Sequence, residues 1–179
     1  MARCRSYLSG LKTSTMEKTW DWRSAFFAQA RSDYELLLLL ERQGAPLNQR
    51  LHYMQMCSEK LAKAFRTEPG GQPPVRKHEA FVYFVRKVAP QNSGLQAVCG
   101  FSGNRQAYQR FLREFTSEAE SIENLSPEGG DHPNPEYPWE SGGTIYSPTD
   151  YDFIHLDTIN NPKVRKLIGF LQKCLELER

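Results

Sequence analysis

The sequence predicts an all-α protein, an up-and-down bundle of about five helices in a single domain. Apolar residues recur at three- and four-residue steps in five stretches, which is the spacing of a helix face. Proline and glycine separate these stretches, and none shows the convincing alternation of a strand. A length of 179 residues suits one domain with its own core. The predicted helices are residues 21–42, 47–66, 77–88, 104–122 and 161–175.

Local signals set the ends of these helices. Gly44 and Pro46 end the first helix, because glycine suits the residue after a helix and proline cannot continue one. The proline- and glycine-rich residues 68–74 end the second. The third and fourth helices end before prolines. Asn161 is an N-cap for the last helix, with Pro162 in its first turn.

A long segment without helical periodicity, residues 126–160, separates the fourth and fifth predicted helices, and we call it the strap. Structureless connections of this length are uncommon in a domain unless they are functional or disordered. The strap is acidic, and it carries aromatic and large apolar residues that disordered linkers lack. These are Tyr137, Trp139, Ile145, Tyr146, Tyr151, Phe153 and Ile154. We expect an ordered strap whose aromatic residues anchor it between helices, because the acidic surroundings disfavour stacking on nucleic-acid bases.

The charges are unevenly distributed, although the net charge is only +2. From Glu114 to Pro162 the chain holds many acidic residues and neither Lys nor Arg, so the rest is strongly basic. Two interpretations remain open. Either the acidic segment folds over the basic helices and neutralises them, or part of the basic surface stays open for a polyanion. Residues 1–18 are expected to be a flexible basic arm outside the helical domain, residues 19–179.

Cysteine spacing and hydropathy exclude several classes of protein. The four cysteines form no CxxC pair and are widely scattered, which disfavours a cysteine-rich zinc site and a disulfide framework. The acidic residues 150–157 have neither EF-hand nor HExxH spacing, so we predict no metal site and no cofactor. The longest apolar run, Leu36–Leu40, is far shorter than a membrane span, and no secretory signal is visible. We therefore predict a cytoplasmic protein without a membrane segment.

The second predicted helix carries residues in the order of a known signature. Gln55, Glu59, Lys60, Lys63 and Ala64 follow the pattern Q-x-x-E-K-x-x-K-A, with one residue's difference in the Gln-to-Glu spacing. Each pair alone is ordinary helix chemistry. Their order, between matching breaks in the chain, makes the pattern more specific than its parts.

Two further elements follow in the same order. His78 and Phe81 match an element in which a Ser, Thr or Lys precedes His, with Leu or Phe three residues later. Tyr137 and Pro138 match an Arg-Tyr-Pro element, with Glu136 in the place of the arginine. Together the elements resemble the HEPN superfamily, small helical bundles named for nucleotide binding in higher eukaryotes and prokaryotes. The resemblance follows the order of elements along most of the chain, although its motifs are short.

Many HEPN proteins are ribonucleases with an Arg, four to six intervening residues, and a His. Two such pairs meet across a homodimer, where the His serves acid–base chemistry and the Arg holds the phosphate. No arginine occurs at that spacing before any of the four histidines of this sequence, His52, His78, His132 and His155. The missing motif favours a protein without this catalytic activity.

The resemblance therefore implies a non-catalytic binding or regulatory module that forms a homodimer. Its partner is expected to be a nucleotide, an RNA or another protein, in a bacterial toxin–antitoxin or defence system. Two alternatives remain open. One is a motif-divergent, metal-independent ribonuclease with His78 as its catalytic candidate, and the other is a structural interaction subunit of a larger complex.

One group of candidate ligand-binding residues opens the third predicted helix. Arg76, Lys77 and His78 follow the proline- and glycine-rich break. A helix N-terminus with adjacent basic side chains suits a phosphate group. The structural alternative is that His78 hydrogen-bonds to a neighbouring helix and fixes the third helix on the bundle.

A second group lies along one flank of the second helix, away from its apolar stripe. These candidates are His52, Glu59 and Lys63, with Arg66 on the same flank. They either contact a ligand or form a solvated or interface edge of the bundle.

Overall fold

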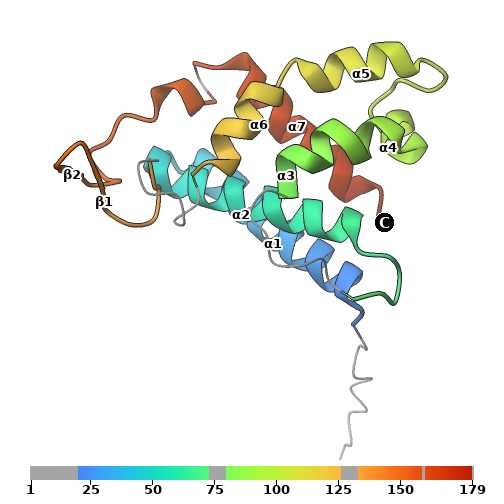
Figure 1. Ribbon diagram of the computed structural model, residues 1–179, viewed down its shortest axis with the longest axis horizontal. Coiled ribbons are helices and arrows are strands. Elements are labelled where there is room, and N and C mark those ends of the chain that lie inside the picture. Colours follow the sequence, from blue (N-terminus) through green and yellow to red (C-terminus); the bar gives the residue numbers. More distant parts are fainter. Residues whose placement is uncertain (1–19, 73–79, 126–132, 159, 179) are drawn as a thin grey trace, which may run out of the picture.

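The computed structural model describes residues 20–72, 80–125, 133–158 and 160–178 (Figure 1). This part of the chain is mostly helical, as predicted. It holds seven α-helices, α1 (Trp22–Arg42), α2 (Leu47–Arg66), α3 (Ala80–Tyr83), α4 (Ser93–Val98), α5 (Arg105–Arg113), α6 (Thr116–Glu123) and α7 (Pro162–Glu176). A two-stranded hairpin of β1 (Trp139–Ser141) and β2 (Thr144–Tyr146) precedes α7. The predicted basic arm, residues 1–18, lies outside the described residues.

The helices α1 and α2 pack against each other along their length (Figure 1). Asp21 caps α1 by accepting a hydrogen bond from the Ser24 amide at 2.7 Å. Gly44 follows α1 with φ of 63°, a left-handed conformation that glycine adopts without steric cost. Lys60 of α2 pairs with Asp33 of α1 at 2.5 Å between Nζ and Oδ2. The two helices are therefore joined by a turn that contains a glycine, and an ion pair crosses their interface.

Aromatic rings join α2, α3 and α7 in the core. Phe84, which follows α3, stacks on Phe65 of α2 with 4.8 Å between ring centroids. Phe84 also contacts Phe170 of α7 at 6.0 Å, and Phe115 lies 5.3 Å from Phe170. Phe84, Phe115 and Phe170 are completely buried. Burial of these large rings stabilises the packing of the later helices on the α1–α2 pair.

The helix that begins as α3 widens into a π turn, Phe84–Val88, and then tightens into a 3₁₀ turn, Ala89–Gln91. The amide of Ala89 donates to the carbonyl of Phe84, five residues earlier. Pro90 accounts for the distortion. It has no N–H to donate, and in an α-helix its ring would collide with the carbonyl of Arg86 four residues before.

The π turn separates two pairs of neighbouring side chains. Phe84 and Val85 both point into the core, whereas Arg86 and Lys87 are both exposed. Single π turns of this kind are frequent at functional sites. Two adjacent cations are thereby held on an anchored stretch of backbone.

The predicted fourth helix, residues 104–122, is wrong as one element, because the structure divides it into α5 and α6. The break lies at Glu114 and Phe115, and the Thr116 hydroxyl donates to the Leu112 carbonyl at 2.9 Å. Burial of Phe115 beside Phe170 accompanies this change of direction. Apolar spacing continues through the break, so the sequence pattern does not reveal it.

Two more elements were not predicted. Asn92 caps the short helix α4 by accepting from the Leu95 amide at 2.9 Å. The hairpin in the strap contradicts the expectation that the protein has no strands. Its turn is Gly142–Gly143, and both glycines have positive φ, as a tight two-residue hairpin turn requires.

The described part of the strap between residues 133 and 158 holds an aromatic cluster whose ring contacts lie within the strap, whereas anchoring in a groove between helices was expected. Trp139 stacks on Tyr146 across the hairpin with 5.5 Å between ring centroids, and Tyr151 meets its edge at 4.9 Å. Tyr151 in turn contacts Phe153 at 4.8 Å. Tyr137 does not act as an anchor, because it is largely exposed to solvent.

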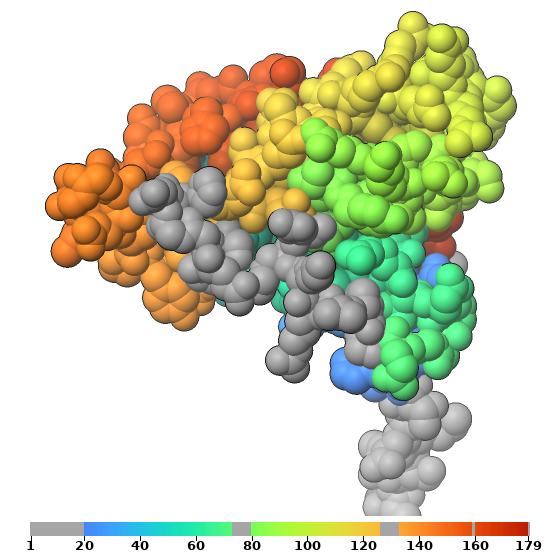
Figure 2. Space-filling view, viewed as in Figure 1, coloured from blue at the N-terminus to red at the C-terminus, as the bar shows by residue number. Residues whose placement is uncertain are grey.

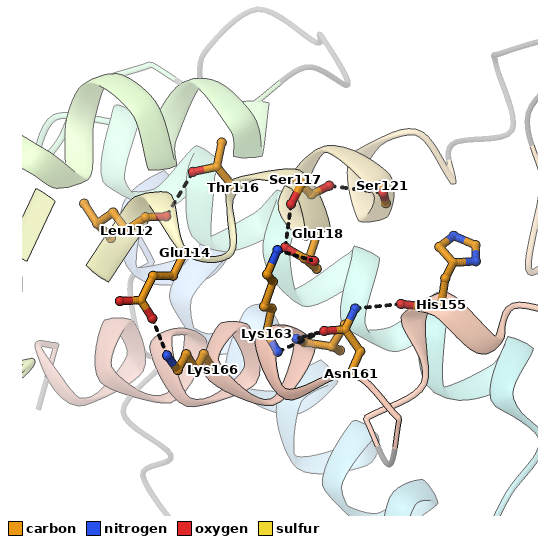
Figure 3. Close-up of polar contacts among 11 residues, drawn as sticks. Leu112, Glu114, Thr116, Ser117, Glu118, Ser121, His155, Asn161, Lys163 and Lys166 are labelled. Carbon is orange, nitrogen blue, oxygen red and sulfur yellow. Dashed lines mark hydrogen bonds and ion pairs between the residues drawn. The ribbon is translucent and has the colours of Figure 1, made fainter. Parts of the chain in front are cut away.

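Polar contacts join the corner between α5 and α6 to α7 (Figure 3). Lys166 of α7 pairs with Glu114, and Lys163 lies 3.8 Å from the carboxylate of Glu118. Asn161 caps α7 as predicted, accepting from the Lys163 amide at 2.9 Å. Part of the acidic segment therefore neutralises basic helices. None of the helices in the described ranges combines the length and hydropathy that a membrane span needs.

Tyr34 of α1 gives a pH-dependent prediction. Burial raises the pKa of Tyr34 to about 12, and its hydroxyl donates to the Ile168 carbonyl at 3.4 Å. The unfolded chain releases this proton near pH 10, at about the ordinary tyrosine pKa. The Tyr34 contribution to stability is therefore complete below about pH 10 and falls as the pH rises towards 12.

We expect the free energy of unfolding, measured with urea, to fall between about pH 10 and pH 12 in the wild type. The slope of this fall against pH should be smaller in Tyr34→Phe. Equal slopes in the two proteins would assign the alkaline loss to other groups.

Candidate functional site

The first group of predicted site residues lies outside the described part of the chain. Arg76, Lys77 and His78 fall within residues 73–79, and His132 lies in a second such segment. Both the predicted phosphate site and the catalytic candidate His78 therefore stay predictions.

The second group makes two separate contacts. His52 faces the strap, with its Nδ1 3.7 Å from Glu136 Oε2, and Asn48 donates to the Pro135 carbonyl nearby. Lys63 pairs with Glu59, one helical turn earlier. Seven residues place Glu59 about 10 Å along α2 from His52. The structure therefore places His52 beside the strap and does not bring it together with Glu59 and Lys63 in one site.

A hollow of about 550 Å³ opens between the end of α2, the stretch from α3 into the π turn, and α6. In Figure 2 the green surface of residues 80–98 adjoins the gold surface of α6 on this side of the molecule. We call it the Tyr83 hollow. Its cationic and aromatic residues are Arg66, Tyr83, Arg86 and Lys87, and its acidic residues are Glu120 and Glu123.

Arg66 and Tyr83 form a platform in this hollow. The guanidinium carbon of Arg66 lies 5.1 Å from the centroid of the Tyr83 ring, which is cation–π geometry. Tyr83 is 51% exposed, so much of the ring remains open to solvent. An exposed ring beside cations can stack on a planar ligand that carries negative charge.

Arg86 faces Glu120 of α6 across the hollow, and the two side chains form an ion pair. Their side chains are 54% and 39% exposed. Exposed ion pairs contribute about 0–1 kcal/mol, so another anion can replace the carboxylate at Arg86 at little cost. Lys87 has no carboxylate within ion-pair distance among the described residues.

Glu123 has a structural task at the base of the hollow. Its Oε1 accepts hydrogen bonds from the amides of Phe81 and Val82, at 2.8 and 3.2 Å. These bonds tie the start of α3 to α6. The carboxylate therefore fixes two walls of the hollow relative to each other.

A second hollow, of about 420 Å³, opens on the other side of the π turn, against α5. We call it the Arg113 hollow. Arg86 and Arg113 supply its charge, Gln109 an amide, and Pro90 and Leu112 apolar surface. No carboxylate is among its described lining residues. Arg86 lines both hollows, so the two are neighbours.

The sequence interpretation named Arg66 on the flank of the second helix, but it missed Tyr83, Arg86 and Lys87. A signal for these three was present, because they lie off the apolar face of the third predicted helix. Pro90, four residues after Arg86, also marks a distortion of that helix. The sequence could not show that α2 and α6 form the other walls of the Tyr83 hollow.

The described residues contain no group of three or more His, Cys, Asp or Glu side chains placed to hold a metal ion. Burial raises the pKa of the Cys174 thiol well above its usual value and that of Cys99 to about 11. These thiols are therefore poor nucleophiles near neutral pH.

Comparison of the chain with known proteins finds no matching family model, no similar curated protein and no similar solved structure. The HEPN resemblance stays a prediction. Inferences about function therefore start from the surface of this chain.

Proposed function

We propose that this protein is a non-catalytic, HEPN-like binding module whose ligand is a nucleotide held in the Tyr83 hollow. The observation that carries the proposal is the guanidinium of Arg66 over the open ring of Tyr83, in a hollow that Arg86 and Lys87 also line. A base is planar and a phosphate is anionic, so a nucleotide matches both features. The volume of about 550 Å³ lies within the usual range for small-molecule sites.

In the proposed complex the base stacks on the exposed surface of Tyr83. The phosphate pairs with Lys87 and Arg86, and it replaces Glu120 as the partner of Arg86. Arg86 keeps an anionic partner in this exchange, the half-exposed Glu120 carboxylate turns to solvent, and Lys87 adds a further attraction to the phosphate. Arg66, at the end of α2, stays in cation–π contact with the Tyr83 ring.

Other parts of the functional hypothesis depend on the HEPN resemblance alone. These are the homodimer, the protein or RNA partner, and the role in a toxin–antitoxin or defence system. They remain predictions beside the nucleotide proposal.

The test is calorimetric titration of the four ribonucleoside monophosphates at low salt into the wild type and Tyr83→Ala. Removing a stacking ring costs about 1–3 kcal/mol per base, so we expect roughly 5- to 150-fold weaker binding in the variant. Tyr137→Ala is the matched control, because Tyr137 is 55% exposed and lies in the strap.

Two results would contradict the proposal. One is that none of the four nucleotides binds the wild type. The other is that Tyr83→Ala binds as tightly as Tyr137→Ala, which would place the nucleotide elsewhere.

A further inference from the structure

Arg86 lies between the two hollows and lines both. It lines the Tyr83 hollow on one side of the π turn and the Arg113 hollow on the other. The π turn holds its backbone against the core, because Phe84 and Val85 beside it are buried. A single anionic group at Arg86 is therefore within reach of ligand parts in both hollows.

The Arg113 hollow is large enough to hold more than a phosphate group, and its lining offers both polar and apolar contacts. Its volume of about 420 Å³ is within the range of small-molecule sites, and a lone phosphate group would not fill it. Pro90 and Leu112 offer apolar surface, and the Gln109 amide can donate and accept hydrogen bonds. Arg113 is exposed, and no carboxylate lies within ion-pair distance of it in the described part of the chain.

We infer that the ligand is two nucleosides joined by a phosphodiester, with the bridging phosphate at Arg86; this inference rests on the proposed function. The first nucleoside stacks on Tyr83. Its 5′ phosphate pairs with both Lys87 and Arg86 in a bound monophosphate, and it keeps Lys87 when the bridging phosphate of the longer ligand pairs with Arg86. The second nucleoside occupies the Arg113 hollow. There Arg113 contributes charge and the planar face of its guanidinium, and Gln109 contributes hydrogen bonds.

This ligand chemistry has two sources, a free dinucleotide and a stretch of single-stranded nucleic acid. Both place a phosphodiester between two bases. A strand differs from a free dinucleotide because its chain continues beyond the two bases and must leave both hollows. Both hollows are open to solvent on the described surface, so either ligand can place its phosphodiester at Arg86.

The experiment compares adenosine monophosphate with 5′-phosphorylated diadenylate by calorimetry at low salt. We expect the wild type to bind the dinucleotide about tenfold more tightly, the gain from roughly one further charge-assisted contact. Arg113→Gln should remove this gain and leave the affinity for the mononucleotide unchanged. Arg110→Gln is the matched control, because Arg110 is also exposed in the last turn of α5 and does not line the hollow.

Unchanged melting temperatures of the two variants will show that each is folded. A deca-adenylate titration separates the sources of the ligand. If the decamer binds at least as tightly per site as the dinucleotide, the inference holds for a strand. If the dinucleotide binds more tightly, it holds for a free dinucleotide.

The inference is overturned if the dinucleotide binds no more tightly than the monophosphate, or if Arg113→Gln and Arg110→Gln behave alike. In that case Tyr83-dependent binding of the monophosphate would still support the proposed function. If none of these probes binds, both the inference and the proposed function are overturned.

Discussion

Replacing Phe84 by alanine is expected to lower the free energy of unfolding by about 3–5 kcal/mol. The side chain is completely buried and stacks between Phe65 and Phe170, so its removal leaves a cavity where three elements meet. Surrounding rings are held by their own neighbours and can fill the space only in part. Urea unfolding followed by far-UV circular dichroism measures the loss.

Tyr83→Ala is the control for this prediction, since Tyr83 is the adjacent aromatic residue but is half exposed. It is expected to change the unfolding free energy by less than about 1 kcal/mol, the usual size of an exposed cation–π contact. A Phe84→Ala protein as stable as Tyr83→Ala would mean that the core does not depend on this ring. Nucleotide binding should also weaken in Phe84→Ala, because Arg86 and Lys87 sit on the same turn.

Replacing Trp139 by alanine is expected to cost about 3 kcal/mol and to loosen the strap. Trp139 is 9% exposed, and Tyr146, Tyr151 and Phe153 all lie around its ring. Two three-residue strands do not form a stable hairpin in water without such packing. Amide hydrogen exchange should therefore speed up in both strands, alongside the fall in unfolding free energy.

Trp22→Ala provides the comparison, because Trp22 is 51% exposed on α1. Its effect on stability should stay within about 0.5 kcal/mol, and exchange in the hairpin should not change. Wild-type exchange rates in the strands of Trp139→Ala would show that the hairpin is held by other contacts, such as the Arg50–Asp157 pair at 3.6 Å.

The helices that were predicted most closely are those whose ends carry local signals. The second predicted helix, 47–66, has the bounds of α2, while α1 differs from its prediction by one residue at its start and α7 by one residue at each end. Gly44 and Asn161 set these limits through the backbone conformation and hydrogen bonds of their own neighbourhoods. Such signals act over three or four residues, so the sequence contains them in full.

The hairpin shows a signal that was present and overlooked. Gly142–Gly143 between two short β-prone stretches is a recognisable hairpin turn. The division between α5 and α6 is different. No glycine or proline marks it, and the apolar spacing runs through it without interruption. The packing of Phe115 against Phe170, distant in sequence, accompanies the turn of the chain.

The neutralising interpretation of the charge asymmetry holds for part of the described surface, and the polyanion interpretation stays a prediction. Glu114, Glu118 and Asp157 pair with basic residues of α7 and α2, as the neutralising interpretation predicts. Lys87 and Arg113 have no such partner among the described residues, which leaves positive charge beside both hollows. Composition gives the sum of the charges, but it does not say which of them meet.

The sequence by itself determined the helical class, the long helices, and the aromatic character of the strap. These properties follow from periodicity and capping, which are local. Only the tertiary structure decided where the hollows lie and which cations line them. Arg66, Arg86 and Arg113 come from three different elements, and their approach depends on how α2, α5 and α6 pack around the π turn. Long-range packing of this kind leaves no pattern in the order of residues, because it depends on contacts between residues far apart in the chain.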